Sequence, residues 1–330
     1  MTLGIVDVGT NSIHLLIGIL GLNGKFHVIL KERDLTRLGE GGLADGKLTR
    51  RAMARAMTVL RRYRAILKRC DVDHVEAVAT SAVRDAKNGR AFVRRVRATL
   101  RLPLRIISGS SEARLIYLGV LHTHRVHGPT VVVTIGGGSA QVMQGDGARL
   151  RYAASVPLGG ARLAQRFIHA DPPTPLELGA LIPYVQRIWR PVIRKLSRHR
   201  WRRALGSSAT IAQLAMAAYW QQHHKRPRAK QSLSLTQGAL RALAAWLATS
   251  TAKQRIQLPG LDPRREDLAL TTAVTLLVWM EGCRVSTLRY APGSLREGLV
   301  MDYLLRHHQR QTQRFESPLT DLIAAMGDPP

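Results

Sequence analysis

The sequence has 330 residues, of which 45% are hydrophobic, so it is long enough to bury the cores of two domains. It carries 50 lysines and arginines against 22 acidic residues, and the formal charge of +28 attracts polyanions. Aromatic residues make up only 5% of the chain, which argues against the base-stacking surface of a single-strand binder and leaves an inorganic polyanion, or arginines that simply face solvent.

Two short apolar runs at the start of the chain, 3–6 and 13–20, are predicted as strands joined by a tight hairpin turn. The turn contains Gly9, Thr10, Asn11 and Ser12. Glycine gives such a turn unusual backbone angles, and the short polar side chains hydrogen-bond locally. Backbone N–H groups and hydroxyls that point in one direction form a cradle for a phosphate oxygen, and Asp7 beside them can hold a hard cation. By itself the stretch is equally an ordinary hairpin turn.

The next elements alternate between helix and strand. Thr49 caps a predicted helix that extends to about Arg69, and a strand over 75–79 delivers the segment 80–84 to its carboxyl end, where a ligand crevice is expected. A helix over 89–100 and a strand over 104–107 follow. The next helix carries Glu112 in its first turn, and we expect Ser110 or Ser111 to cap it. A glutamate in this position is often only a favourable partner of the helix dipole.

The second half of the chain repeats the first turn. Residues 133–139 match 6–12 position for position, with the first glycine and the serine in register, and three strands are predicted between 131 and 156. Two similar turns so far apart indicate a duplicated domain whose halves face each other across a cleft. Mostly helical segments follow as far as Glu281, and a closing helix begins at Leu295.

Five further segments, at 79–88, 107–120, 156–159, 206–210 and 295–299, accompany the two turns along nearly the whole chain. In composition and order they resemble the exopolyphosphatase and guanosine pentaphosphate phosphatase family of the actin, Hsp70 and sugar-kinase superfamily. The resemblance implies an α/β fold of two ribonuclease H-like (actin-like ATPase) domains flanking a central cleft. We divide the chain into a first domain over 1–125, a second over 126–294, a closing helix near 295–307 that packs back on the first domain, and a polar tail over 308–330.

The resemblance also implies a chemistry: a hydrolase that releases terminal phosphate from inorganic polyphosphate or guanosine pentaphosphate. Glu112 would be the general base that activates water, and Arg84 would neutralise phosphate oxygens. Asp7 would hold Mg²⁺, directly or through water. The residues implied to bind substrate are Thr10, Asn11, Ser12, Gly137, Gly138, Ser139, Ser208 and Thr210.

The sequence departs from the family pattern at the metal site. Thr134 and Gln141 stand where the family has acidic residues. Asp7 with substrate phosphates could still hold magnesium at weaker affinity, arginines near the cleft such as Arg84 and Arg114 could replace the cation, or hydrolysis could be lost while binding remains. Ala209, where relatives usually have glycine, puts the close backbone approach of its loop in question.

Three functions therefore stay open. The first is the hydrolase, the second is a weakened or inactive family member that binds polyphosphate or guanosine tetraphosphate as a sensor, and the third is an ATP-dependent kinase, which the segment around Glu112 disfavours. The expected partner is polyphosphate or a guanosine polyphosphate nucleotide, with nonspecific binding of other polyanions. A homodimer also stays open, because the sequence does not fix the oligomeric state.

Composition also bears on the compartment. Cys70 and Cys283 are too isolated for a disulfide framework or a zinc site, and this is typical of a reducing compartment. No basic-then-apolar leader precedes Leu3, and the longest apolar stretch, 268–280, is shorter than a membrane span. We expect a cytoplasmic protein without a membrane partner.

Overall fold

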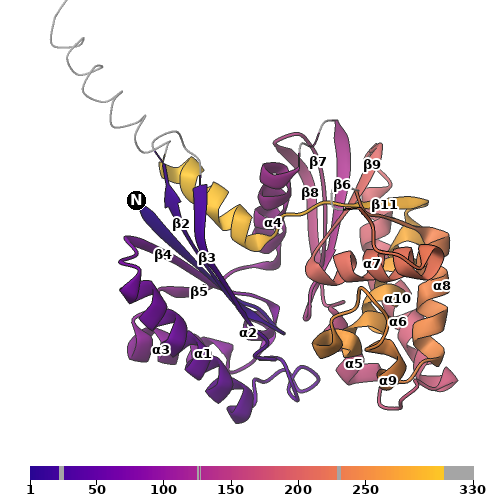
Figure 1. The fold of residues 1–330 in the computed structure, drawn as a ribbon, viewed down its shortest axis with the longest axis horizontal. Helices are drawn as coiled ribbons and strands as arrows, with labels where there is room; N and C mark the ends of the chain where they lie inside the picture. The colour runs from indigo at the N-terminus through magenta and orange to yellow at the C-terminus, as the bar shows by residue number, and fades with distance from the viewer. Residues whose placement is uncertain (22–25, 125, 127, 229–231, 308–330) are drawn as a thin grey trace, which may run out of the picture.

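The computed structural model describes residues 1–21, 26–124, 126, 128–228 and 232–307, which form two α/β lobes (Figure 1). The predicted polar tail at 308–330 lies outside these residues. Among the described helices, none is long and apolar enough to cross a membrane.

The first lobe is built on a five-stranded sheet in the order β3-β2-β1-β4-β5. Its strands are β1 (Thr2–Val8), β2 (Ile13–Leu20), β3 (Phe26–Asp34), β4 (His74–Ala79) and β5 (Leu104–Ile106). One face is covered by α1 (Arg50–Arg69) and α3 (Gly89–Leu100), and the short helix α2 (Ser81–Asp85) follows β4. The predicted cap of α1 is confirmed, because the Thr49 side chain accepts a hydrogen bond from the backbone N–H of Ala52.

The second lobe is built on a six-stranded sheet in the order β10-β11-β9-β6-β7-β8. Its strands are β6 (Pro129–Ile135), β7 (Ala140–Asp146), β8 (Arg149–Val156), β9 (Arg203–Ser207), β10 (Ser234–Thr236) and β11 (Thr287–Tyr290). Its helices are α5 (Gly160–Phe167), α6 (Pro175–Leu196), α7 (Ala209–His223), α8 (Gln237–Thr249), α9 (Ala252–Arg255), the 3₁₀ helix η1 (Pro263–Leu268) and α10 (Ala269–Gly282).

The two lobes share one construction. In each, three antiparallel strands are followed by a parallel strand that pairs with the first of them: β4 with β1, and β9 with β6. The hairpin turns come at equivalent places, with Val8 opposite Ile13 in one lobe and Ile135 opposite Ala140 in the other. The duplicated α/β architecture predicted from the two turns is confirmed.

Two helices join the lobes. The helix α4 (Gly109–Thr123) packs against β7 and β8 of the second sheet, and residues 295–307 form a helix that packs beside it on the first sheet (Figure 1). The contact is close: a Cβ atom on Gly298 would lie 1.8 Å from the carbonyl oxygen of Leu115. Ser108, rather than the predicted Ser110 or Ser111, caps α4, because its hydroxyl accepts from the N–H of Ser111 at 3.1 Å.

Candidate active site

A cavity of about 200 Å³ opens where the two hairpin turns meet between the lobes. Most of the residues predicted from the sequence line it: Asp7, Thr10, Asn11, Ser12, Glu112, Thr134, Gly137, Gly138, Ser139, Ser208 and Thr210. Arg84 and Gln141 are not in its wall but contact residues that are. The cavity therefore brings together residues that the chain order separates by up to two hundred positions.

The two turns have the same backbone geometry and touch each other. Gly9 N–H donates to the Ser12 carbonyl at 3.0 Å, and Gly136 N–H donates to the Ser139 carbonyl at 2.9 Å. None of the glycines in the two turns adopts a positive φ. The prediction that these positions need glycine for its unusual backbone angles is therefore wrong. At Gly138 the reason is space, because a Cβ atom there would lie 2.3 Å from the Thr10 hydroxyl oxygen.

Glu112 reaches the cavity from the first turn of α4. It is 7% exposed, and this burial raises the pKa of its carboxyl group above the usual range, while the adjacent Arg84 opposes the shift. The Arg84 guanidinium donates to Glu112 Oε2 at 2.7 Å and to the Ile107 carbonyl at 3.3 Å. A buried carboxylate with a raised pKa beside a phosphate-sized cavity is suited to accept a proton near neutral pH.

Asp7 lies at the end of β1 and also faces the cavity. Its Oδ1 atom is buried and has no hydrogen-bond partner among the described residues. Burial raises the pKa of Asp7 to about 7; the carboxylates of Glu112 and Glu297 add to this shift and Arg296 opposes it. An unpaired carboxylate oxygen in a cavity is a candidate ligand for a hard cation.

The neighbours of Asp7 show how far the site fits magnesium. Gln141 Nε2 donates to the hydroxyls of Ser139 at 2.8 Å and Ser155 at 3.2 Å, so its amide supports the second turn. Within the described ranges no three acidic, histidine or cysteine side chains cluster as metal ligands. Since Mg²⁺ is often held by one or two carboxylates with phosphates and water, Asp7 fits an ion that is bound together with phosphate.

Sequence reasoning missed the basic side chains of the cavity, Arg33, Arg265 and Arg296, which surround His14. Burial and these three arginines lower the pKa of His14 to about 3, so the ring is neutral and its Nδ1 accepts from Arg296 at 3.1 Å. Arg296 belongs to the segment 295–299 already noted, whereas no motif marks Arg33 or Arg265.

Arg265 is the most confined of these cations. It is 8% exposed, and within the part of the chain that the structure describes its Nε atom has no hydrogen-bond partner. Burial lowers the pKa of Arg265 to about 10, which leaves it charged at neutral pH. By contrast, Arg114 forms an ion pair with Asp302 and does not line the cavity, so the expectation that it substitutes for the cation is wrong.

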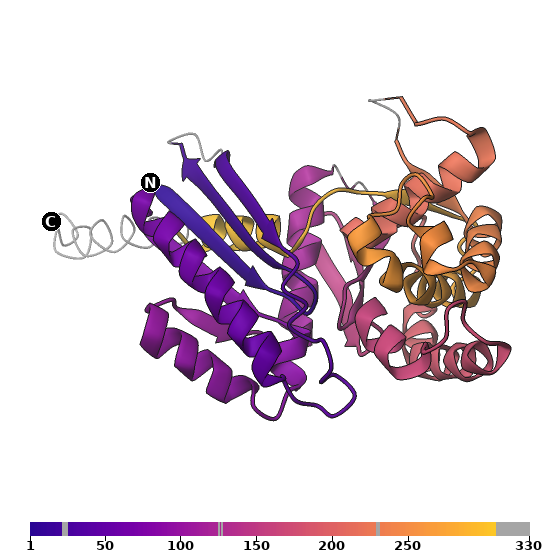
Figure 2. The same cartoon turned by 60° about the horizontal axis from the view of Figure 1, so that its bottom comes forward.

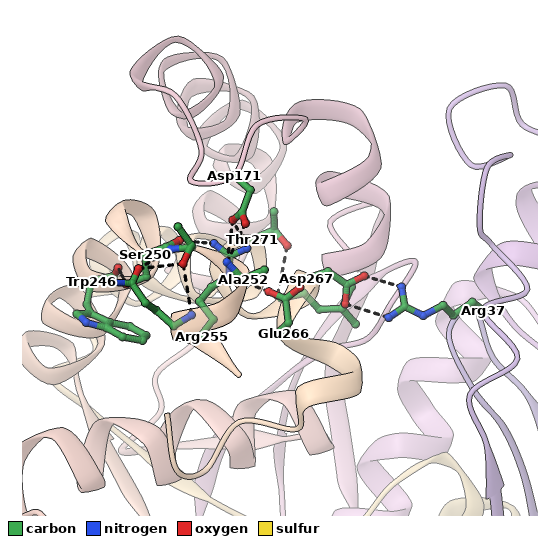
Figure 3. Close-up of polar contacts among 12 residues, drawn as sticks. Arg37, Asp171, Trp246, Ser250, Ala252, Arg255, Glu266, Asp267 and Thr271 are labelled. Carbon is green, nitrogen blue, oxygen red and sulfur yellow. Dashed lines mark hydrogen bonds and ion pairs between the residues drawn. The ribbon is translucent and has the colours of Figure 1, made fainter. Parts of the chain in front are cut away.

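Ion pairs hold the segment of η1 that follows Arg265, and Figure 3 shows those of Glu266 and Asp267. The next residue, Glu266, accepts from Arg255 at 2.8 Å within the second lobe. Asp267 accepts from Arg37 of the first lobe at 2.7 Å, and Arg37 also donates to the Arg264 carbonyl at 2.8 Å. The short helix is therefore tied to both lobes, on either side of the residue that enters the cavity.

The loop before α7 forms another wall. Ser208 has a φ of 107°, which is strained for a residue other than glycine, and its hydroxyl caps α7 by accepting from Ile211 N–H at 3.2 Å. Ala209 is the first residue of α7, and Thr210 is buried at the cavity. The loop thus approaches the cavity although Ala209 replaces the family's usual glycine.

Comparisons with known proteins agree with this architecture. The sequence model of the Ppx/GppA phosphatase family matches residues 21–307. Exopolyphosphatase 1 of Mycobacterium tuberculosis is 29% identical over 303 residues, covering 91% of this chain and 88% of that protein. Exopolyphosphatase 1 of Mycobacterium leprae is 28% identical and covers 91% and 89%.

Solved structures give the same result. The crystal structure of an exopolyphosphatase from Cytophaga hutchinsonii has a TM-score of 0.83 at 28% identity and covers 92% of this chain and 98% of that chain. The Aquifex aeolicus member of the Ppx/GppA family has a TM-score of 0.74 at 27% identity, with coverage of 93% and 98%. The predicted fold class of two actin-like domains is confirmed.

Proposed function

The chain belongs to the Ppx/GppA phosphatase family, and we propose that it is an exopolyphosphatase-type hydrolase that releases terminal phosphate from inorganic polyphosphate, guanosine pentaphosphate or both. The observation that carries the proposal is the buried Glu112 carboxylate, whose pKa is raised, in the wall of the cavity where both turns meet. A kinase of the same superfamily is disfavoured because the segment around Glu112 resembles that of the hydrolases.

In this proposal the terminal phosphate binds between the turns. Their backbone N–H groups and hydroxyls, with the unpaired Asn11 Nδ2, donate to its oxygens. Arg265, Arg296 and Arg33 supply positive charge in the same cavity, where partial burial strengthens their attraction for phosphate. Binding is thus achieved mainly by fixed donors, which suits a reaction that depends on positioning and charge stabilisation.

The chemical step assigns separate roles to Glu112 and Arg84. Phosphate oxygens offer Arg84 an alternative partner, which frees the Glu112 carboxylate to accept a proton from water. The water oxygen then bonds to the terminal phosphorus while the bridging P–O bond breaks, and the shortened chain leaves with that electron pair. The raised pKa makes Glu112 a better base than an exposed glutamate at the same pH.

We assign the cation contact to Asp7, with Thr134 and Gln141 as neutral neighbours. Magnesium bound there would neutralise charge on the phosphates as the bridging bond breaks. Asp7 can contribute a carboxylate oxygen only after it loses its proton, and burial delays this loss to about pH 7.

A second candidate function is a sensor that binds polyphosphate or guanosine tetraphosphate without turnover. The neutral Thr134 and Gln141 favour it, as does the ion pair that occupies Glu112. The test is release of phosphate from long-chain polyphosphate and guanosine pentaphosphate, with and without Mg²⁺, by the wild type and by Glu112→Gln.

Magnesium-dependent release that Glu112→Gln abolishes would support the hydrolase. The matched control is Glu281→Gln, which removes an exposed carboxylate paired with Arg241 on the second lobe and should leave release unchanged. Tight binding of polyphosphate without product under any divalent cation would establish the sensor instead. Unchanged turnover in Glu112→Gln would remove Glu112 from the mechanism.

A further inference from the structure

The outer helices of the first lobe carry charge of one sign only. Helix α1 has eight lysines and arginines and α3 has four, and neither helix contains aspartate or glutamate. In the second lobe the long helix α6 has four basic residues and includes Glu177. Helices α1 and α3 therefore carry 12 of the 50 lysines and arginines of the chain without any acidic residue between them.

Part of this charge has partners and part has none. On the side of α1 next to β3, Arg55 pairs with Glu40 and Arg62 pairs with Asp34. Eight other basic side chains are exposed, and none of them has a hydrogen-bond or ion-pair partner within the described part of the chain: Arg50, Arg51, Arg61, Lys68, Arg69, Arg90, Arg94 and Arg95. We call these eight residues the basic face.

Such a face is unfavourable without a counter-charge. Like charges three or four residues apart destabilise a helix by roughly 0.2–0.5 kcal/mol per pair, and soluble surfaces usually intersperse both signs. Neither of the two adjacent helices has an acidic residue that would offset the repulsion between their basic side chains. A polyanion that spans both helices would supply this negative charge. An α-helix of 20 residues such as α1 extends about 30 Å, which exceeds the reach of a single phosphate group.

The two helices of the basic face are connected at their amino-terminal ends to segments that contact or line the cavity. Helices α1 and α3 lie side by side on the first sheet (Figures 1 and 2). Their amino-terminal ends are tied together, because Leu48 and Asn88 exchange two hydrogen bonds of 2.8 and 2.9 Å. The loop before α1 donates a hydrogen bond to the Thr10 carbonyl, and Ser81 of α2, which precedes α3, lines the cavity.

We infer that the basic face is a track for the distal part of a polyphosphate chain whose terminal phosphate occupies the cavity. The inference rests on the proposed function and specifies long-chain polyphosphate as the preferred substrate class, since a guanosine nucleotide has no long phosphate chain that could follow two helices. Nucleic acid fits less well. The aromatic residues of the two helices, Tyr63 and Phe92, are 0% and 2% exposed and offer bases no stacking surface.

The test removes four charges and leaves the cavity unchanged. Arg61, Lys68, Arg90 and Arg94 are replaced together by glutamine, and the control replaces Arg190, Arg194, Lys195 and Arg198 of the second lobe, which are likewise exposed. Both variants lose the same charge. The face variant should raise KM for long-chain polyphosphate about tenfold, with kcat and all kinetics on tripolyphosphate unchanged, whereas the control should stay near wild type.

Equal effects of the two variants on long-chain KM would overturn the track, because net charge alone would then explain them. An equal effect on tripolyphosphate would also overturn it, by placing the defect in the cavity. A face variant that loses single-stranded DNA binding but keeps its long-chain KM would assign the face to nucleic acid. Equilibrium binding of long-chain polyphosphate is measured with the same variants. This measurement tests the track even if the wild type releases no phosphate, because a lack of release would refute only the proposed hydrolase.

Discussion

Replacing Asp7 by asparagine is expected to stabilise the protein while it abolishes metal-dependent turnover. The native carboxyl group has a pKa of about 7, and its Oδ1 atom is buried with no hydrogen-bond partner in the described ranges of the chain. The same group in the unfolded chain ionises near its ordinary value of 3.8. Between these values the native state holds a proton that the unfolded state has lost, so this group lowers stability as pH rises from about 4 to about 7.

The size of the effect follows from the shift. A difference of about three pH units corresponds to at most ~4 kcal/mol of unfolding free energy. Asp7 is partly open to the cavity, which reduces the penalty, and we expect about 2 kcal/mol at pH 8. Asparagine has nearly the same shape and no ionisable group, so the variant should gain this amount at pH 8 and little at pH 4.5.

The measurement is urea unfolding of the wild type and Asp7→Asn at both pH values, with phosphate release followed in parallel. Asp45→Asn is the matched control, because Asp45 is exposed and has no ion-pair partner among the described residues. A variant that is less stable than the wild type at pH 8, or whose stability difference is the same at both pH values, would refute the reasoning. Full magnesium-dependent activity in Asp7→Asn would refute the assigned metal contact.

Three further predictions concern other parts of the molecule. Gly298→Ala should cost about 2 kcal/mol or more, because its Cβ would collide with the Leu115 backbone, whereas Gly238→Ala in α8, where a Cβ meets nothing within 4 Å, should stabilise slightly; thermal unfolding compares the two. Arg255→Ala should cost about 3 kcal/mol in denaturant unfolding, because it leaves Glu266 and Asp171 without their buried partner, and the exposed Arg241→Ala should cost under about 0.5 kcal/mol. Thr134→Asp combined with Gln141→Glu should lower the Mg²⁺ concentration for half-maximal phosphate release, and a magnesium titration that coincides with the wild type would contradict the metal assignment.

Much of the fold could be predicted from the sequence because the relevant signals are local. The stripe of apolar residues in α1, its Thr49 cap and the two repeated turns each lie within a short window of the chain. The predicted position of the α4 cap was wrong by two or three residues. Ser108, Ser110 and Ser111 all carry hydroxyls, and only the backbone geometry distinguishes them. The short strands β9 and β11 were missed because they contain few residues and their pairing is nonlocal.

The candidate site was predictable only where a residue belongs to a turn or motif. Glu112 and the turn residues satisfy this condition. Arg33 and Arg265 do not, because they reach the cavity from β3 and η1 through tertiary packing, among 50 basic residues that look alike in the sequence. Arg114 was misassigned for the same reason, since its proximity to Glu112 in the chain does not reveal that Asp302 engages it.

The arrangement of charge in the cavity gives its two acids different tasks. Asp7 and Glu112 both face the cavity, and each is buried enough for its pKa to rise, but among the described residues only Glu112 forms an ion pair with a guanidinium group. Different environments for two nearby carboxyl groups are typical of sites in which one group acts as an acid or base and the other stays ionised to stabilise charge. An incoming phosphate adds negative charge that would raise both pKa values further. Arg265, Arg296 and Arg33 can offset this charge at the substrate, while Asp7 still needs a cation of its own. The arginines and magnesium are thus complementary in this site, and substitution of either one should not be rescued by an excess of the other.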